Sequence, residues 1–177
     1  MLKGKVVTVR PIVESDLPVL YEHIMNLENR GEFWPPNIST MTQLEKDLKE
    51  HGFWRDDFGS VVIIDNESGK LIGQMFFFKT VQYMVELEVG YIMYDTTSRT
   101  KGGTTEACKM LTSYLFDVRP VNRIRLCIAS DNLASRRVAE KSGYLHEGTQ
   151  RGAAWNKGKI YDMELYAVTR GDWQSAG

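Results

Sequence analysis

The 177-residue sequence has little of what a disulfide scaffold, a membrane protein or a nucleic-acid-binding protein requires. Its two cysteines are too few for a disulfide framework and favour a reducing compartment. No stretch approaches the roughly eighteen apolar residues of a membrane helix, and the start, "MLKGKVVTVR", has no apolar segment of signal-peptide length. The formal net charge of −1 gives no argument for binding nucleic acid or an acidic membrane. We therefore expect a cytoplasmic protein whose partners must be inferred from individual sites.

What is present predicts one domain. With 42% hydrophobic residues at this length, the chain can bury a core without metal or disulfide. No repeat, low-complexity tract or linker interrupts residues 1–177. His23, His51 and His146 are far apart in the sequence and have no second ligand at metal spacing, so we expect no metal site.

Hydrophobic periods of two and of 3.6 residues alternate along the chain and predict strands and helices in mixed order. The expected strands are "KVVTVRPI", "SVVIID", "LIGQMFFFKT", "ELEVGYIMYD", "NRIRLCIAS", "YLHEGTQRGAA" and "IYDMELYAV". The expected helices are "LPVLYEHIMN", "TMTQLEKDLKEHG", the segment from Gly102, and "NLASRRVAEKSG". Short polar connections favour an antiparallel meander in the middle, and the helix from Gly102 favours a parallel crossover. The expected class is α/β (α+β), a mixed sheet with helices on both faces.

The stretch "TSRTKGGTTEACKMLTSYLF" joins a predicted strand to a predicted helix. A glycine-rich turn at a helix start presents unpaired amide hydrogens at the positive end of the helix dipole, which suits a phosphate. Arg99 and Lys101 add positive charge there. A lone Gly-Gly pair is more often a simple tight turn, but its place between two parallel strands favours phosphate binding. The stretch has neither the ending of a nucleotide P-loop nor the glycine spacing of a dinucleotide fold.

Three segments in order, "ELEVGYIM", "SRTKGGTTEA" and "NLASRRVAEKSGYLHEG", resemble the GNAT family of acetyl-CoA-dependent N-acetyltransferases, in particular its RimJ/RimL-like branch. The resemblance spans nearly the whole chain. It implies a GNAT fold with a central sheet of about seven strands, a V-shaped splay between strands 4 and 5, and coenzyme A in that splay. Relatives of this kind often form homodimers.

The resemblance also implies the reaction. Acetyl-CoA would donate an acetyl group to a primary amine by direct attack in a ternary complex. The acceptor is either the α-amine of a protein or peptide, or the amine of a small molecule such as an antibiotic or a polyamine. The competing interpretation is a non-catalytic coenzyme A-binding module that serves as a sensor or interaction scaffold, because a fold alone does not fix a function.

The family's phosphate signature, Arg/Gln-x-x-Gly-x-Gly/Ala, falls on Arg99, Gly102 and Thr104, and Thr104 departs from the usual small residue. Asn132 matches a position that contacts pantetheine, although it can equally be a plain helix N-cap. Arg136 and Lys141 either reach the adenosine phosphates or are simply solvated. The predicted cofactor-binding residues are Tyr91, Ile92, Met93, Arg99, Thr100, Lys101, Gly102, Gly103, Thr104, Asn132, Arg136 and Lys141.

Amine acetylation needs a base for the amine proton, a donor for the oxyanion and a proton for the leaving thiolate. Glu88 alternates with Val89, so it faces away from the core if its apolar neighbours face inward, and Glu86 shares its face as the rival base. The resemblance favours Glu88 as the catalytic base. The acidic tyrosine of many GNAT enzymes corresponds to Ala139 here, and the RimJ/RimL-like branch implies Ser135 as proton donor or relay.

Aromatic residues are concentrated in the segments expected around the cleft. Clustered there, they would grip an apolar or planar part of the acceptor, although aromatics in loops also cap cores. The predicted substrate-binding residues are Phe33, Trp34, Trp54, Trp155 and Tyr161.

Overall fold

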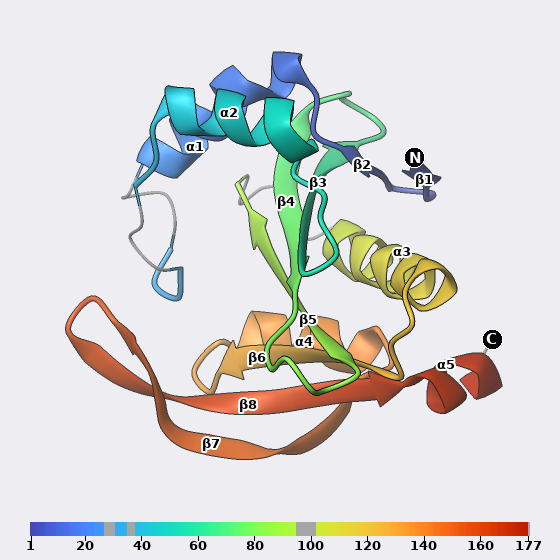
Figure 1. Cartoon of the computed structure of the whole chain (residues 1–177). Coiled ribbons are helices and arrows are strands. Elements are labelled where there is room, and N and C mark those ends of the chain that lie inside the picture. Colours follow the sequence, from blue (N-terminus) through green and yellow to red (C-terminus); the bar gives the residue numbers. More distant parts are fainter. Residues whose placement is uncertain (27–30, 35–37, 95–101, 177) are drawn as a thin grey trace.

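The computed structural model describes residues 1–26, 31–34, 38–94 and 102–176 (Figure 1). Its strands are β1 (Leu2–Lys3), β2 (Val7–Pro11), β3 (Phe58–Asp65), β4 (Leu71–Phe78), β5 (Glu86–Met93), β6 (Arg123–Ala129), β7 (Leu145–Asn156) and β8 (Lys159–Thr169). Its helices are the 3-10 turn η1 (Glu14–Asp16), α1 (Leu17–Met25), α2 (Met41–His51), α3 (Gly103–Val118), α4 (Leu133–Lys141) and α5 (Arg170–Ala176). None of the helices in these ranges is long and apolar enough to cross a membrane.

The strands form one mixed sheet in the order β1-β2-β3-β4-β5-β6-β8-β7. The β3-β4-β5 meander is antiparallel and β5 pairs with β6 in parallel, as the sequence predicted. The sheet has eight strands instead of about seven, because the two-residue β1 is too short to show an alternating pattern.

The sheet opens between β5 and β6. The two strands pair only through residues Glu86, Leu87 and Glu88 of β5, which face Arg123, Ile124 and Arg125 of β6. Past this point β5 continues beside β4 and β6 continues beside β8. In Figure 1, β3 and β4 stand nearly upright and β5 slants beside them, while β6 to β8 run across the bottom. This is the V-shaped splay that the resemblance implied.

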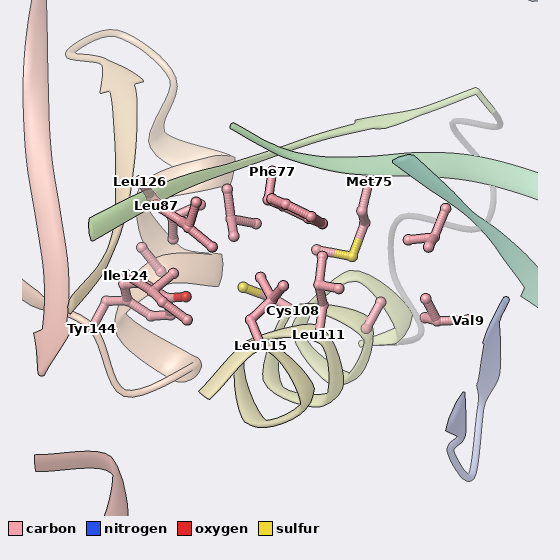
Figure 2. Packing of buried hydrophobic residues seen from close by; sticks show 14 of the residues in the cluster. Val9, Met75, Phe77, Leu87, Cys108, Leu111, Leu115, Ile124, Leu126 and Tyr144 are labelled. Carbon is pink, nitrogen blue, oxygen red and sulfur yellow. The ribbon is translucent and has the colours of Figure 1, made fainter. Parts of the chain in front are cut away.

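Strand alternation sends two different sets of side chains to the two faces of the sheet. Figure 2 shows Cys108, Leu111 and Leu115 of α3 pointing toward Met75 and Phe77 of β4 in one buried cluster. A second cluster on the other face joins α1 and α2 to β3, through residues that include Leu17, Leu20, Leu44 and Val62. Helices therefore cover both faces, and β5 carries Leu87 and Val89 on the α3 face and its two glutamates on the other.

Candidate active site

The first turn of α3 is shaped by two glycines. Gly102 adopts the left-handed conformation at φ 78° and is the N-cap. A Cβ on Gly103 would lie 2.7 Å from Cγ1 of Val7, so only glycine lets the helix start this close to β2. Amides in the first turn of a helix have no intrahelical acceptor, and here those of Gly103 and Thr104 are the first in line. The predicted ligands Arg99, Thr100 and Lys101 lie outside the described residues.

A hollow of about 380 Å³ lies beside this helix start. This hollow, which we call the lysine hollow, is lined by Lys5, Val6, Gly102, Thr105, Glu106, Lys109 and Lys141. Lys141 was predicted for the cofactor, whereas Lys5 and Lys109 were missed. The spacing of Lys109 was a usable signal, because seven residues after Gly102 are two helical turns and return to the same face. Three lysines around one helix N-terminus suit an anionic group.

Glu106 places a carboxylate among the three lysines of this hollow, but that carboxylate is bound by backbone amides. Its carboxylate accepts the backbone amides of Lys5, Val6 and Val7 at 2.6, 2.8 and 2.9 Å. Burial raises the pKa of Glu106, but the three amides and the Lys5 charge outweigh it and hold the pKa below its usual value. Glu106 thereby fixes the segment before β2 against α3.

The N-terminus of α4 is tied to the open edge of β5. Asn132 is its N-cap, and its side-chain oxygen accepts the amide of Ser135 at 3.2 Å. The Tyr91 hydroxyl donates to the carbonyl of Ser135 at 3.4 Å. Ser135 is half-buried in α4, whose Ala139 packs into the cluster on the α3 face of the sheet, while Glu88 is on the opposite face of β5. The two predicted catalytic residues therefore approach β5 from opposite sides.

Arg136, predicted for the cofactor, makes two hydrogen bonds within the protein. Its Nε donates to the Tyr166 hydroxyl at 3.3 Å and its Nη1 to the Ser130 carbonyl at 3.4 Å. The guanidinium is thus turned toward β8 and the β6–α4 turn, and Arg136 does not line the lysine hollow. In this structure the guanidinium is therefore engaged by the protein's own groups, and its predicted role in cofactor binding stays a prediction.

The β6–α4 turn, which places Asn132, is held by Glu164 of β8. Ser130 Oγ donates to Glu164 Oε1 at 2.7 Å, and Oε2 contacts His146 Nε2 at 2.6 Å and accepts Thr149 Oγ1 at 2.9 Å. The Ser130 hydrogen bond, with those of His146 and Thr149, lowers the pKa of Glu164 to about 2, against the opposing effect of burial.

Because Ser130, His146 and Thr149 stabilise the ionised form of Glu164, we expect part of the free energy of unfolding to be lost in acid. A carboxyl whose pKa is lower in the folded than in the unfolded state stabilises fully above its unfolded pKa, and that stabilisation is lost as the pH falls toward 2. We expect the thermal unfolding temperature of the wild type to fall more steeply than that of Glu164→Gln between about pH 4.5 and pH 2. Parallel curves for the two proteins would contradict this.

Glu88 is the last residue of β5 that pairs with β6. Its Oε2 accepts Arg125 Nε at 2.9 Å and lies 2.9 Å from Arg125 Nη2. The side chain is 16% exposed. Burial raises the pKa of Glu88, Arg125 opposes the rise, and Glu86 adds to it. A partly buried carboxyl with a raised pKa at the mouth of a splay is a good candidate base.

Glu86, the alternative candidate for the catalytic base, has both carboxylate oxygens bound by protein groups. It is 4% exposed. Its Oε1 accepts Thr80 Oγ1 at 2.8 Å and lies 3.2 Å from Arg125 Nη1, and its Oε2 accepts Arg123 Nε at 3.0 Å. Both oxygens are therefore used, which favours a structural role.

Aromatic rings lie next to Glu88 on the same face. In the β4–β5 register, Phe78 is opposite Glu88 and Phe76 is opposite Gly90. A Cβ on Gly90 would lie 2.3 Å from the Phe76 ring, so glycine leaves room for that ring. The Phe76 ring contacts those of Phe78 and Trp34, with centroids 6.2 and 5.3 Å apart. The sequence analysis missed both phenylalanines, although alternation in "QMFFF" marks them as sharing one face.

The rest of the predicted pocket comes from segment 31–34, which is held by the β7–β8 hairpin. Asn156 Nδ2 donates to the carbonyls of Glu32 and Trp34 at 2.8 and 3.4 Å. Phe33 packs edge-on against Tyr161 with centroids 6.0 Å apart. We use the name aromatic row for Tyr161, Phe33, Trp34, Phe76 and Phe78.

Two predicted substrate residues are elsewhere. The Trp54 ring lies against Phe77 and Tyr114, with centroids 4.9 and 6.0 Å apart, and packs on the cluster of the α3 face. Trp155 pairs with Ile160 and is 70% exposed, so strand alternation points it away from the face of Tyr161. The positions of both depend on register, which the prediction did not include.

Comparison with known proteins identifies the family. The model of the acetyltransferase (GNAT) domain matches residues 7–145. The chain is a GNAT acetyltransferase. The Bacillus subtilis (strain 168) protein named "Putative ribosomal N-acetyltransferase YdaF" is 31% identical over 174 residues, which cover 95% of this chain and 93% of that protein. This GNAT protein is thus an N-acetyltransferase whose cofactor is acetyl-CoA, as the sequence predicted.

Solved structures agree on the fold. Spermidine N-acetyltransferase from Vibrio cholerae, in complex with CoA and spermine, has a TM-score of 0.80 at 18% identity, covering 97% of this chain and 99% of that one. RimL, a ribosomal L7/L12 α-N-protein acetyltransferase in complex with coenzyme A, has a TM-score of 0.78 at 18% identity, covering 94% and 95%. At 18% identity, these two similarities show only that this GNAT enzyme shares their fold.

Proposed function

We propose that this GNAT enzyme acetylates a primary amine by direct attack in a ternary complex, with Glu88 as the base. The observation that carries the proposal is the position of Glu88. It is the last residue of β5 that pairs with β6 before the two strands separate. Its partner on the neighbouring strand β4 is Phe78, which is one end of the aromatic row. A base and an apolar wall therefore meet where the splay opens.

The residues present fit coenzyme A. The edge of β5 that no longer pairs with β6, at Tyr91 and Ile92, would pair with the pantetheine arm, as a strand would. The amides of Gly103 and Thr104 would hold the pyrophosphate, and the lysine hollow would hold a further phosphate. When bound, acetyl-CoA supplies the acetyl group as a reactive thioester.

The protein's own residues handle protons and position. Glu88 accepts the proton that the amine loses as its nitrogen bonds to the acetyl carbon, directly or through one water. Ser135, on the other side of β5, donates or relays a proton to the sulfur as the carbon–sulfur bond breaks. A serine is a weak acid, so its replacement should slow turnover without abolishing it.

The aromatic row supports an acceptor with an apolar or planar part beside its amine. By their names, one structural neighbour acts on spermidine and another on the amino terminus of a ribosomal protein. We propose that the acceptor of this enzyme belongs to the same two classes, a protein or peptide α-amine or a small-molecule amine.

Thiol release from acetyl-CoA over a panel of amines tests the function. The panel contains spermidine, peptides with different first residues, and small aromatic amines. Turnover on any of them that is lost in Glu88→Gln supports the proposal. Binding of acetyl-CoA without release on every amine contradicts it and favours the coenzyme A-binding module.

The lysine hollow predicts the effect of removing its charges. We expect Lys109→Ala and Lys141→Ala each to weaken coenzyme A binding about five-fold, since one phosphate contact of roughly 1 kcal/mol is lost. The weakening should shrink at high salt. Calorimetric titration at low and high salt measures both effects. Lys46→Ala on the exposed face of α2 is the control, and a loss equal to that in Lys109→Ala would contradict the assignment.

We also propose three broader properties of this protein. They are a single domain over residues 1–177, a location in the cytoplasm and a homodimer. One continuous sheet supports the first, and two free cysteines support the second.

A further inference from the structure

Three glutamates and two arginines form a ladder of ion pairs at the base of the splay. The ion pairs follow the strand register, because Glu86 is opposite Arg123 and Glu88 is opposite Arg125. Arg125 reaches both carboxylates, with Nη1 near Glu86 and with Nε and Nη2 on Glu88. The ladder ends on β7, where Glu147 takes both Nη groups of Arg123.

The ladder is rigid at one end. Glu86 is buried and bound by Thr80, Arg123 and Arg125, so it fixes the Arg125 guanidinium. The guanidinium in turn grips a single oxygen of Glu88, Oε2. The other oxygen, Oε1, accepts no hydrogen bond from the described residues. Arg125 thus limits the rotation of the carboxylate without using both of its oxygens.

We propose that Arg125 is a positioning residue, which holds the Glu88 carboxylate by Oε2 and leaves Oε1 to accept the proton of the acceptor amine or of a bridging water. The inference rests on the proposed function, since it takes Glu88 to be the base. It adds a residue whose effect on the reaction runs through the base.

The charged groups that face Glu88 set the expected pH effect. In the described part of the chain these are Arg125 on β6 and Glu86 on β5, while the Cys127 thiol on β6, whose pKa burial raises, and Phe78 on β4 are uncharged. Arg125 is the positive group, and it lowers the pKa of Glu88 against burial and against Glu86. Loss of Arg125 leaves only influences that raise the pKa.

The first test is a direct titration. The carboxyl carbon signal of Glu88 is assigned by its loss in Glu88→Gln and is followed with pH in the wild type, Arg125→Gln and Arg125→Lys. We expect the midpoint in Arg125→Gln to move to higher pH by about one unit. In Arg125→Lys, which keeps the charge, it should return toward the wild-type value. An unchanged midpoint in a folded Arg125→Gln protein overturns the proposal.

The second test is kinetic. The active form of Glu88 is deprotonated, so the acid limb of kcat/KM against pH should move upward in Arg125→Gln by about one unit, matching the titration. At pH values above that limb, kcat should still be about ten-fold below wild type because the carboxylate is no longer oriented. A uniform loss at every pH, without movement of the limb, overturns the proposal.

The variants separate the possible failures. Wild-type protein that turns over no amine overturns the proposed function, while the titration still decides whether Arg125 controls Glu88. Full activity of Glu88→Gln overturns both. If Arg125→Gln does not fold, Arg125→Lys is used for the test. A lysine cannot contact Oε2 of Glu88 through two nitrogens as Arg125 does, so a wild-type kcat in Arg125→Lys overturns the proposal. Lys46→Gln is the charge-matched control and should leave midpoint and rate unchanged.

Discussion

Replacing Glu88 with glutamine is expected to lower kcat/KM for the acceptor amine by about 10²- to 10⁴-fold, the usual contribution of a general base. Glutamine has the same shape but cannot accept the proton. Coenzyme A binding should be unchanged, because the helix start and the lysine hollow are formed by other residues. Thiol release gives the rate, and calorimetric titration gives the affinity. The fold should persist, since Arg125 keeps its contact with Glu86.

Glu86→Gln is the matched control on the same strand and face. Glu86 is buried between two arginines, so this change should lower the free energy of unfolding by about 3 kcal/mol. Its effect on kcat/KM should be far smaller than that of Glu88→Gln. If instead Glu86→Gln abolished turnover in folded protein and Glu88→Gln did not, the two roles would have to be exchanged.

The fold could be predicted from the sequence wherever side-chain periodicity was strong. Alternation in "ELEVGYIM" predicted both the strand and the face of Glu88, and the glycines before the periodic run predicted the start of α3. The N-cap role of Asn132 needed only its position before a helix. These features depend on residues near one another in the chain, which is why a single sequence contains them.

The missed parts of the candidate site depend on pairing between distant strands. Arg125 contacts Glu88 because β5 and β6 align in one register, and Phe78 lies beside Glu88 because β4 and β5 align in another. The face on which Trp155 lies depends on register in the same way, since one step along β7 reverses the face of a side chain. No local pattern in the sequence determines a register of this kind.

Trp34 and Trp54 give the second large prediction, because their rings contact different neighbours, Phe76 and Phe77. Trp34→Ala should raise KM for the acceptor about ten-fold, through loss of one aromatic contact of about 1.5 kcal/mol, with little change in stability. Trp54→Ala should lower the free energy of unfolding by about 3 kcal/mol and the unfolding temperature by about 6–12 °C. Steady-state kinetics and thermal unfolding of both variants measure these effects.

The physical reason lies in what each ring contacts. Trp34 is in segment 31–34 and touches Phe76 on the Glu88 face, so its loss opens the acceptor wall. Trp54 covers Phe77 and is itself covered by Arg119, whose guanidinium lies 5.8 Å from its ring, so its loss opens a cavity beside the core. A raised KM in Trp54→Ala at a temperature where it is folded, together with a normal KM in Trp34→Ala, would move the acceptor site to the α3 face of the sheet.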